Sequence, residues 1–164
     1  MALLAAMVFA GTALAWAGNA RFDPLFRSVV AALHQKCALR LRLPARVPDM
    51  GQGREPIYAV IGDASARRYT VYLAFTPDCN GASFCRIATF AARPAGERPE
   101  GPGAEGKGTP VRLAGGRRGT YVESECGANC SDAEIRWREG SVEYLAGVKG
   151  GSRADAVRLA NACF

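Results

Sequence analysis

The chain has 164 residues, of which 22% are charged and 49% hydrophobic, so it can form one packed domain and is too apolar for a disordered chain. Its 19 glycines and 9 prolines disfavour a helical bundle. The net charge of +6 comes mainly from arginine, which indicates either an anionic partner or, because acidic residues are interspersed, an ordinary solvated surface.

The N-terminal segment of the chain has the pattern of an export signal. Residues 1–20 carry no charge, and residues 3–15 form an apolar stretch that is followed by small residues suited to cleavage. We therefore predict a signal peptide over residues 1–20 and a secreted or periplasmic domain over residues 21–164. The alternative is an uncleaved N-terminal anchor with Trp16 at the membrane interface. No later stretch is long and apolar enough to span a bilayer.

Local patterns predict the elements of this domain. Asp23 is a helix N-cap followed by proline, and Ser152 with Asp155 begins a last helix in the manner of a capping box. Between them, alternation of apolar and polar residues indicates strands. We expect a helix over residues 24–36 and a second helix from residue 152. The strands expected between them cover residues 38–43, 57–61, 68–76, 84–92, 111–113, 119–125, 133–138 and 141–149. The first clear hairpin is expected to turn at residues 62–65.

This order of elements predicts the fold class. A helix, a run of antiparallel strands and a second helix indicate an α+β domain. We expect one curved antiparallel sheet of about six to seven strands, with the N-terminal and C-terminal helices packed on one face. A flexible loop is expected at about residues 93–110, which are rich in Gly, Pro and Glu. Trp137 alternates with Arg136 and Arg138, which places it in the core under the helices.

Six cysteines in an exported chain favour disulfides. The short loops between neighbouring strands predict the pairs Cys79–Cys85 and Cys126–Cys130, and the remaining pair is then Cys37–Cys163. The alternative is a zinc site built from the four loop cysteines. The wide gap between Cys79 and Cys85 and the oxidising compartment both disfavour zinc.

The strand over residues 68–76 is apolar on both faces, which predicts a groove or a second covered face. The candidate groove residues lie on the face opposite Leu73. A groove there could hold an apolar ligand or a partner strand, whereas the plain structural interpretation is that a loop packs on it. The candidate groove residues are Tyr58, Val60, Tyr72 and Ala74.

Arginines on two predicted strands form a candidate basic stripe, if those strands are neighbours. No aromatic residue alternates with these arginines to stack on bases, which disfavours nucleic acid as a partner. An anionic glycan or lipid would suit the stripe better, and a solvated sheet face is the plain alternative. The candidate stripe residues are Arg40, Arg42, Arg136 and Arg138.

Residues that could carry catalysis are scattered. His34, the one histidine, lies on the first predicted helix with no nucleophile nearby in sequence. Asp78 and its neighbours match only part of a calcium loop, and turn chemistry explains them. Glu123 and Glu125 alternate on a strand, and a hydrolase would need a cleft to bring such carboxylates together. We therefore predict no catalytic residue, no metal ligand and no cofactor.

Three motifs carry a resemblance. The segments T-P-D-C-N-G-A at residues 76–82, C-G-A-N-C-S at 126–131, and Trp137 with Gly140 and Tyr144 resemble a group of uncharacterised secreted bacterial proteins, cyanobacterial ones prominently. From Trp137 onward the chain is also similar to a bacterial domain of unknown function found in extracytoplasmic proteins. The resemblance covers roughly residues 22–163 and implies export and a shared fold, with no activity attached.

The sequence as a whole predicts a binding or cell-envelope-associated module that uses a sheet face or groove. Its partner would be an envelope protein or an apolar or anionic ligand. The alternative is an extracytoplasmic hydrolase whose carboxylates are assembled from loops. A polar cleft containing Glu123, Glu125 or Asp78 would favour the hydrolase, and an apolar groove or flat surface would favour the binding module.

Overall fold

A computed structural model describes residues 22–50, 53, 55–97 and 108–164; the predicted signal peptide lies outside them. The described chain begins with a short 3-10 helix and an α-helix, continues through seven strands and closes with a second α-helix. The elements are η2 (Pro24–Phe26), α1 (Arg27–Lys36), β1 (Tyr58–Ser65), β2 (Arg68–Ala74), β3 (Arg86–Pro94), β4 (Thr109–Arg112), η3 (Ala114–Gly116), β5 (Arg118–Val122), β6 (Asp132–Glu139), β7 (Val142–Lys149) and α2 (Arg153–Asn161).

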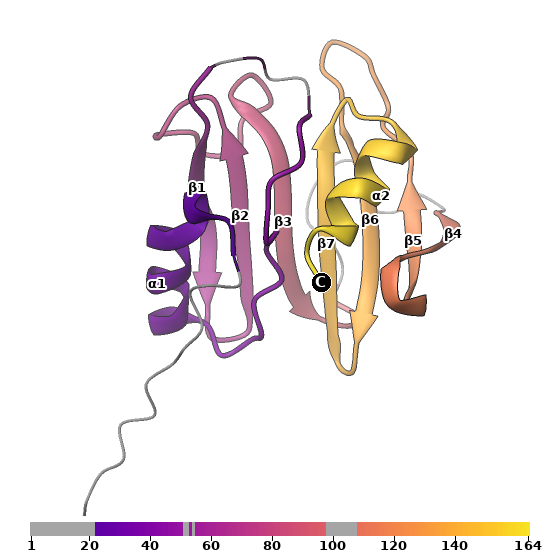
Figure 1. Ribbon diagram of the computed structural model, residues 1–164, viewed down its shortest axis with the longest axis horizontal. Helices are drawn as coiled ribbons and strands as arrows, with labels where there is room; N and C mark the ends of the chain where they lie inside the picture. Colours follow the sequence, from indigo (N-terminus) through magenta and orange to yellow (C-terminus); the bar gives the residue numbers. More distant parts are fainter. Residues whose placement is uncertain (1–21, 51–52, 54, 98–107) are drawn as a thin grey trace, which may run out of the picture.

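The strands form one open antiparallel sheet in the order β1-β2-β3-β7-β6-β5-β4. Both helices lie in front of this sheet in Figure 1, with α1 beside β1 and α2 over β6 and β7. The predicted fold class is therefore confirmed: an α+β domain with one antiparallel sheet, an N-terminal helix and a C-terminal helix, and disulfide bonds.

The predicted cap at Asp23 begins the 3-10 helix η2, which leads directly into α1, and the predicted cap at Ser152 begins α2. Asp23 accepts a hydrogen bond from the Leu25 amide at 3.0 Å, and Pro24 occupies the first turn. Ser152 and Asp155 form a reciprocal capping box, in which the Ser152 side chain accepts from the Asp155 amide and Asp155 accepts from the Ser152 amide. These hydrogen bonds fix where the chain enters each helix.

The segment over residues 38–43 differs from the prediction, because it is not a strand. It crosses the helix-covered face between α1 and α2 in Figure 1. Two tyrosine hydroxyls hold its backbone: Tyr69 accepts from the Arg42 amide at 2.9 Å, and Tyr144 donates to the Arg40 carbonyl at 3.1 Å. Since side chains satisfy these backbone groups, the segment fills the space between the helices without joining the sheet.

Two loop boundaries also differ from the prediction. The β1–β2 hairpin turns at residues 66–67, and Gly62 is part of a bulge between Ile61 and Asp63. At the loop predicted over residues 93–110, β3 continues to Pro94 and β4 begins at Thr109. Residues 98–107 of that loop lie outside the described part of the chain.

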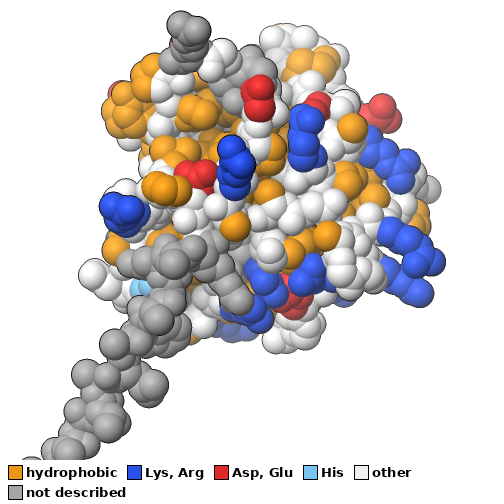
Figure 2. Space-filling model, in the orientation of Figure 1, with side chains coloured by type: hydrophobic (Ala, Val, Ile, Leu, Met, Phe, Trp, Pro, Cys, Tyr) orange, Lys and Arg blue, Asp and Glu red, His pale blue; other side chains and the backbone are white. Residues whose placement is uncertain are grey.

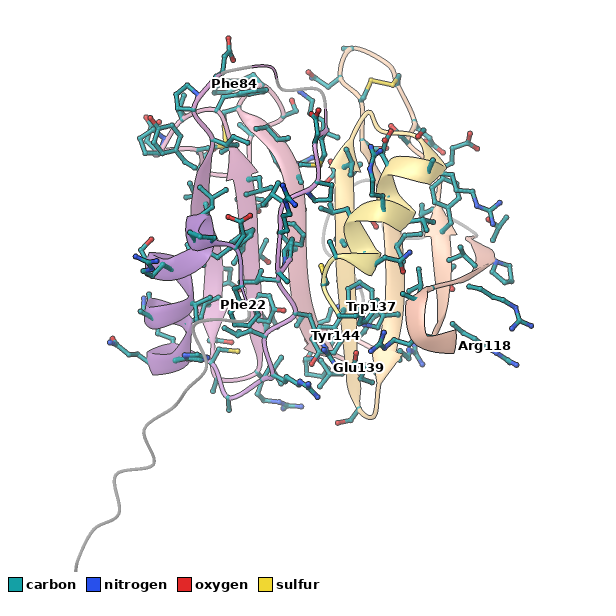
Figure 3. All side chains as sticks on the ribbon, viewed as in Figure 1. Phe22, Phe84, Arg118, Trp137, Glu139 and Tyr144 are labelled. Atoms are coloured by element: carbon teal, nitrogen blue, oxygen red, sulfur yellow. A yellow bond between two sulfur atoms is a disulfide. The ribbon has the colours of Figure 1, made fainter. Side chains whose placement is uncertain are left out.

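The core lies between the sheet and its two helices. The ring of Trp137 is 2% exposed, stacks on Tyr144 at 5.5 Å and meets Phe164 at 5.1 Å, so the prediction that Trp137 lies in the core is confirmed. Figure 3 shows Trp137, Tyr144 and Glu139 together near one end of β6 and β7. In the described ranges, neither helix has both the length and the apolar character that a membrane crossing requires.

Candidate functional site

Two disulfides lie in the loops at one end of the sheet, where β3 and β6 begin; we call this the disulfide end. Cys79 is bonded to Cys85 with Cα atoms 5.8 Å apart, and Cys126 is bonded to Cys130 with Cα atoms 4.0 Å apart. Both local pairs that the loop spacing predicts are therefore confirmed. The alternative zinc site is excluded because its four sulfurs are engaged in these bonds.

The third predicted disulfide, Cys37–Cys163, is wrong for this structure, since both residues are buried free thiols. The Cys163 sulfur donates to the Leu159 carbonyl one helical turn back, at 3.4 Å. Burial raises the pKa of the Cys163 thiol well above its ordinary value. The sequence prediction paired Cys37 with Cys163 because they were the two cysteines left over. A buried cysteine can instead stay free and pack as a small hydrophobic residue.

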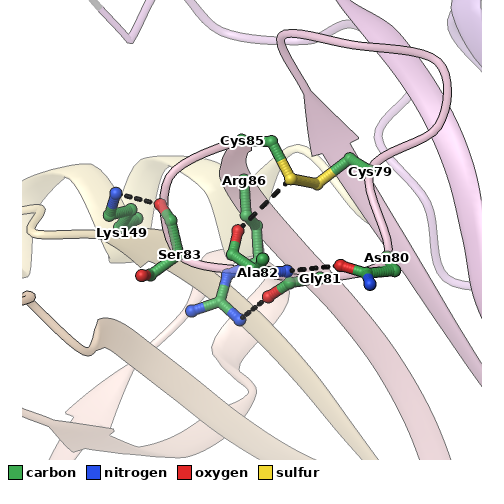
Figure 4. The surroundings of a disulfide bond; sticks show 8 residues. All are labelled: Cys79, Asn80, Gly81, Ala82, Ser83, Cys85, Arg86 and Lys149. Carbon is green, nitrogen blue, oxygen red and sulfur yellow. Dashed lines mark hydrogen bonds between the residues drawn. A yellow bond between two sulfur atoms is a disulfide. The ribbon is translucent and has the colours of Figure 1, made fainter.

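The loop closed by Cys79 and Cys85 is held at several points besides its disulfide (Figure 4). Arg86 donates to the Gly81 carbonyl at 3.0 Å, and the Lys149 ammonium group donates to the Ser83 carbonyl. Within the loop, Asn80 accepts from the Ala82 amide at 3.3 Å, as in an Asx turn. These contacts fix the backbone of the loop.

The four candidate groove residues share one face, because Tyr58 pairs with Ala74 and Val60 pairs with Tyr72. The disulfide loop covers part of that face. Ala74 is completely buried in a small cluster with the two cysteines, and Val60 packs against it. A Cβ atom at Gly81 would lie 2.6 Å from the Tyr72 ring, so the loop backbone sits directly on that ring. The face is therefore a second small core at this point, and Tyr58 alone remains well exposed.

The exposed aromatic residues lie at this same end. Among the described residues, the large hydrophobic side chains that are exposed are Tyr58 at 36%, Phe75 at 38% and Phe84 at 82%. Tyr58 begins β1, and Phe75 follows β2. The Phe75 amide donates to the Cys85 carbonyl at 2.9 Å, and Cys85 is the residue after Phe84. Figure 3 shows Phe84 at this end, and hydrophobic side chains gather there in Figure 2. We call the surface formed by Tyr58, Phe75 and Phe84 the aromatic end.

The two outer strands of the sheet differ in how they are protected. The edge strand β4 has four residues and contains Pro110 and Arg112, both of which discourage pairing with another strand. The opposite edge strand β1 has eight residues, and residues 58–61 carry neither charge nor proline before the bulge at Gly62. The stretch of β1 that lacks a protecting charge or proline therefore begins at Tyr58, within the aromatic end.

The predicted basic stripe is not formed. Arg42 is buried on the helix-covered side, where it pairs with Glu139. Arg136 and Arg138 lie on the opposite face of the sheet, in pairs with Glu134 at 2.6 Å and Glu143 at 3.5 Å. The stripe required residues 38–43 to be a strand beside β6, and the structure uses them instead as a covering segment, with Arg40 exposed on it.

The face opposite the helices carries a row of ion pairs across β3, β7 and β6. Asp132 accepts from Arg86 at 2.8 Å and from the Thr89 hydroxyl at 2.7 Å. Arg93 pairs with Glu143 at 2.6 Å. Burial raises the pKa of Glu134 on the same face, although the neighbouring Arg136 opposes this shift. Each of these carboxylates is engaged by an arginine, which favours a structural role for the row.

The candidate catalytic carboxylates are not brought together. Glu123 and Glu125 follow β5 and are exposed, and Glu123 lines a pocket of about 470 Å³. Asp78 is exposed in the Cys79–Cys85 loop, and His34 is exposed on α1. No group of three or more metal-ligating side chains was found among the described residues. The pocket thus contains one of the three predicted carboxylates.

Sequence reasoning missed Phe75 and Phe84 as candidate surface residues. A signal for Phe84 was present, because a large aromatic residue inside a disulfide loop whose cysteines are only six positions apart has little room to turn inward. With the fold and this surface described, the chain was compared with protein-family models, curated proteins and solved structures, and none of the three comparisons gives a match.

Proposed function

We propose that this chain is a protein-binding module that receives an extended segment of a partner at the β1 edge and packs that segment against the aromatic end. The observation that carries the proposal is the location of the exposed large hydrophobic side chains. All three that occur in the described ranges lie at one end of the sheet. Single exposed apolar residues are ordinary, whereas a local concentration of them is typical of an interaction site.

The rigidity of the Cys79–Cys85 loop supports this proposal. Its disulfide, Arg86 and Lys149 fix the loop backbone while Phe84 remains 82% exposed. A loop whose backbone is already fixed loses little backbone conformational freedom when a partner covers its aromatic side chain. Buried aromatic anchors of this kind supply much of the binding free energy in protein interfaces.

The contrast between the two sheet edges supports an extended partner. β4 carries the proline and arginine that protect an edge, and the first half of β1 carries neither. A strand added beside residues 58–61 would pair with the outward backbone groups of β1, and every second side chain would lie on the face of Tyr58. The expected partner segment is therefore uncharged, with apolar residues at alternate positions.

The hydrolase alternative has less support. A carboxylate pair needs two acidic groups on opposite sides of a cleft. The pocket beside Glu123 has no second carboxylate among its described lining residues, and the carboxylates Asp132, Glu134 and Glu143 are all paired with arginines. Nothing in these contacts leaves an acid and a base facing one bound substrate.

We place this binding function outside the cytoplasm. Two disulfides persist best in an oxidising compartment, and the uncharged apolar segment over residues 1–20 fits an export signal. The resemblance of the two cysteine loops to secreted bacterial proteins points in the same direction. A partner in the cell envelope, such as an exposed strand of another envelope protein, would meet the aromatic end there.

A displayed library of random seven-residue peptides tests the proposed function with no assumption about which protein the partner is. Peptides are selected on the native protein and then measured on Phe84→Ser and on Arg118→Ser, which alters the opposite side of the sheet. We expect uncharged peptides with apolar residues at alternate positions, at least tenfold weaker binding to Phe84→Ser and unchanged binding to Arg118→Ser. Failure to enrich any peptide, or binders that ignore the Phe84 substitution, would overturn the proposal.

A further inference from the structure

A second site is suggested by the pocket between the start of β4, the end of β5 and the start of α2. It has a volume of about 470 Å³, and no residue of the aromatic end lines it. Its walls come from three separate parts of the chain that the sheet and the α2 capping box bring together. The described lining residues are Thr109, Tyr121, Glu123, Ser124, Gly151, Ser152 and Arg153.

Two opposite charges in this pocket lack an ionic partner within the described chain. The Glu123 carboxylate has no hydrogen bond or ion pair there, and Arg153 has no carboxylate partner. The Arg153 guanidinium lies 5.6 Å from the centre of the Tyr121 ring and donates weakly to the Pro110 carbonyl at 3.4 Å. By contrast, Arg42, Arg86, Arg93 and Arg136 each pair with a carboxylate.

The charges of Glu123 and Arg153 both act on Tyr121, which lines the same pocket. Burial is the main cause that raises the pKa of its hydroxyl; Glu123 raises this pKa further, and Arg153 opposes the rise. Both charges therefore act on one phenol group, and the described residues show no ion pair between Glu123 and Arg153. The pocket thus presents a carboxylate, a guanidinium and an aromatic ring together.

Two of the polar side chains that line the pocket are engaged in hydrogen bonds of their own. The Ser124 hydroxyl donates to the Ser131 carbonyl at 2.8 Å, and Ser152 is engaged with Asp155 in the α2 capping box. These hydroxyls hold the shape of the pocket and are not left over to bind a ligand. The charges of Glu123 and Arg153 are then the groups that can select what enters.

We propose that this pocket binds a small zwitterion, an amino acid or a short peptide, with its ammonium group toward Glu123 and its carboxylate toward Arg153. A ligand with both charges can engage the two unpaired groups at once, whereas a simple anion or cation leaves one of them unsatisfied. The volume of the pocket accommodates a residue or two, and the Tyr121 ring offers an apolar surface for a side chain. This inference is independent of the proposed protein-binding function, because the two sites share no residue.

Titration of the 15N-labelled protein followed by NMR tests the zwitterion site directly. The probes are L-alanine and alanyl-alanine, with N-acetyl-alanine and alanine amide as analogues that each lack one charge. We expect saturable shifts of the amide signals of residues 121–125 and 151–153 with at least one zwitterion. Binding should be at least tenfold weaker for each blocked analogue. The ratio between the first two probes distinguishes a free amino acid from a peptide as the preferred source.

Substitutions identify the two charged groups. Glu123→Gln and Arg153→Gln should each weaken zwitterion binding at least tenfold, while Glu125→Gln and Arg118→Gln, at exposed positions outside the pocket, should leave it unchanged. Thermal unfolding of each variant confirms that it is folded. The proposal is overturned if no saturable shift occurs at millimolar probe, if N-acetyl-alanine or alanine amide binds as tightly as the zwitterion, or if neither pocket substitution changes the affinity.

Discussion

Arg86 at the start of β3 forms an ion pair with Asp132 at the start of β6, with 2.8 Å between the guanidinium and the carboxylate. The pair spans the intervening strand β7 at Gly147, where a Cβ atom would lie 3.0 Å from the Asp132 carboxylate. Because Gly147 has no side chain, Asp132 can also accept from Thr89 on β3. The same Arg86 holds the Gly81 carbonyl, so this pair anchors the Cys79–Cys85 loop to the centre of the sheet.

Loss of Arg86 should therefore destabilise the fold substantially. We expect Arg86→Met to lower the free energy of unfolding by about 2–4 kcal/mol, because Asp132, with a side chain 5% exposed, would lose its charged partner. The matched control is Arg68→Met, since the Arg68–Glu97 pair is well exposed and should contribute less than about 1 kcal/mol. Urea unfolding measures both, and equal effects would contradict the anchoring role of Arg86.

Two glycines with similar positive φ angles allow the cost of backbone strain to be measured separately from the cost of steric crowding. Gly81 has φ of 89° with the Tyr72 ring 2.6 Å from a Cβ position, whereas Gly96 has φ of 93° and open space around it. Gly96→Ala should cost about 1–2 kcal/mol from backbone strain alone. Gly81→Ala should cost about 1–3 kcal/mol more, because the loop would have to move off Tyr72. Similar losses in denaturant titrations would mean that the loop does not rest on that ring.

The free thiols provide a chemical test of the cysteine assignment. Cys37 and Cys163 are 8% and 4% exposed, and burial raises the pKa of the Cys163 thiol, so neither should react with a thiol reagent in the folded protein at neutral pH. In denaturant without reductant, the two thiols should titrate fully. If the denatured protein contained no free thiol, Cys37 and Cys163 would be bonded and the present assignment would be incorrect.

The pH dependence of stability should reveal the buried position of Glu134. Burial raises the pKa of Glu134 in the folded state, so the folded state favours the protonated carboxyl group. The stabilisation that this raised pKa gives the folded state is fully present below the ordinary carboxyl pKa of about 4.3. It is lost as the pH rises through the raised pKa of Glu134 in the folded state. Relative to Glu134→Gln, the native free energy of unfolding should fall as the pH rises above the ordinary carboxyl pKa of about 4.3. A rise over that pH range would show that the pairing with Arg136 outweighs burial.

The sequence predicted the parts of the fold that depend on local patterns. The caps at Asp23 and Ser152, the burial of Trp137 and the two short disulfide loops all follow from neighbouring residues. The segment over residues 38–43 could not be assigned in this way, because its alternating leucines fit a strand. What places it is contact with Tyr69 and Tyr144, which come from distant strands.

The candidate site was predicted only in part. Tyr58 was recognised as a surface candidate, but it was grouped with Ala74, which the Cys79–Cys85 loop buries completely. Which face a loop covers depends on long-range contacts such as Arg86 with Asp132, and no local pattern encodes them. That Glu123 and Arg153 line one pocket depends in the same way on where the start of α2 lies relative to the end of β5.

The most direct test of the proposed binding function is the affinity of a selected strand-like peptide for the native protein and for Phe84→Ser, measured by isothermal titration calorimetry. Phe84 is 82% exposed, so its replacement should leave the thermal unfolding temperature nearly unchanged. We predict that binding weakens at least tenfold in Phe84→Ser, and that amide signals of residues 58–61 shift on binding only in the native protein. Equal affinities for the two proteins, with no shift along β1, would contradict the account.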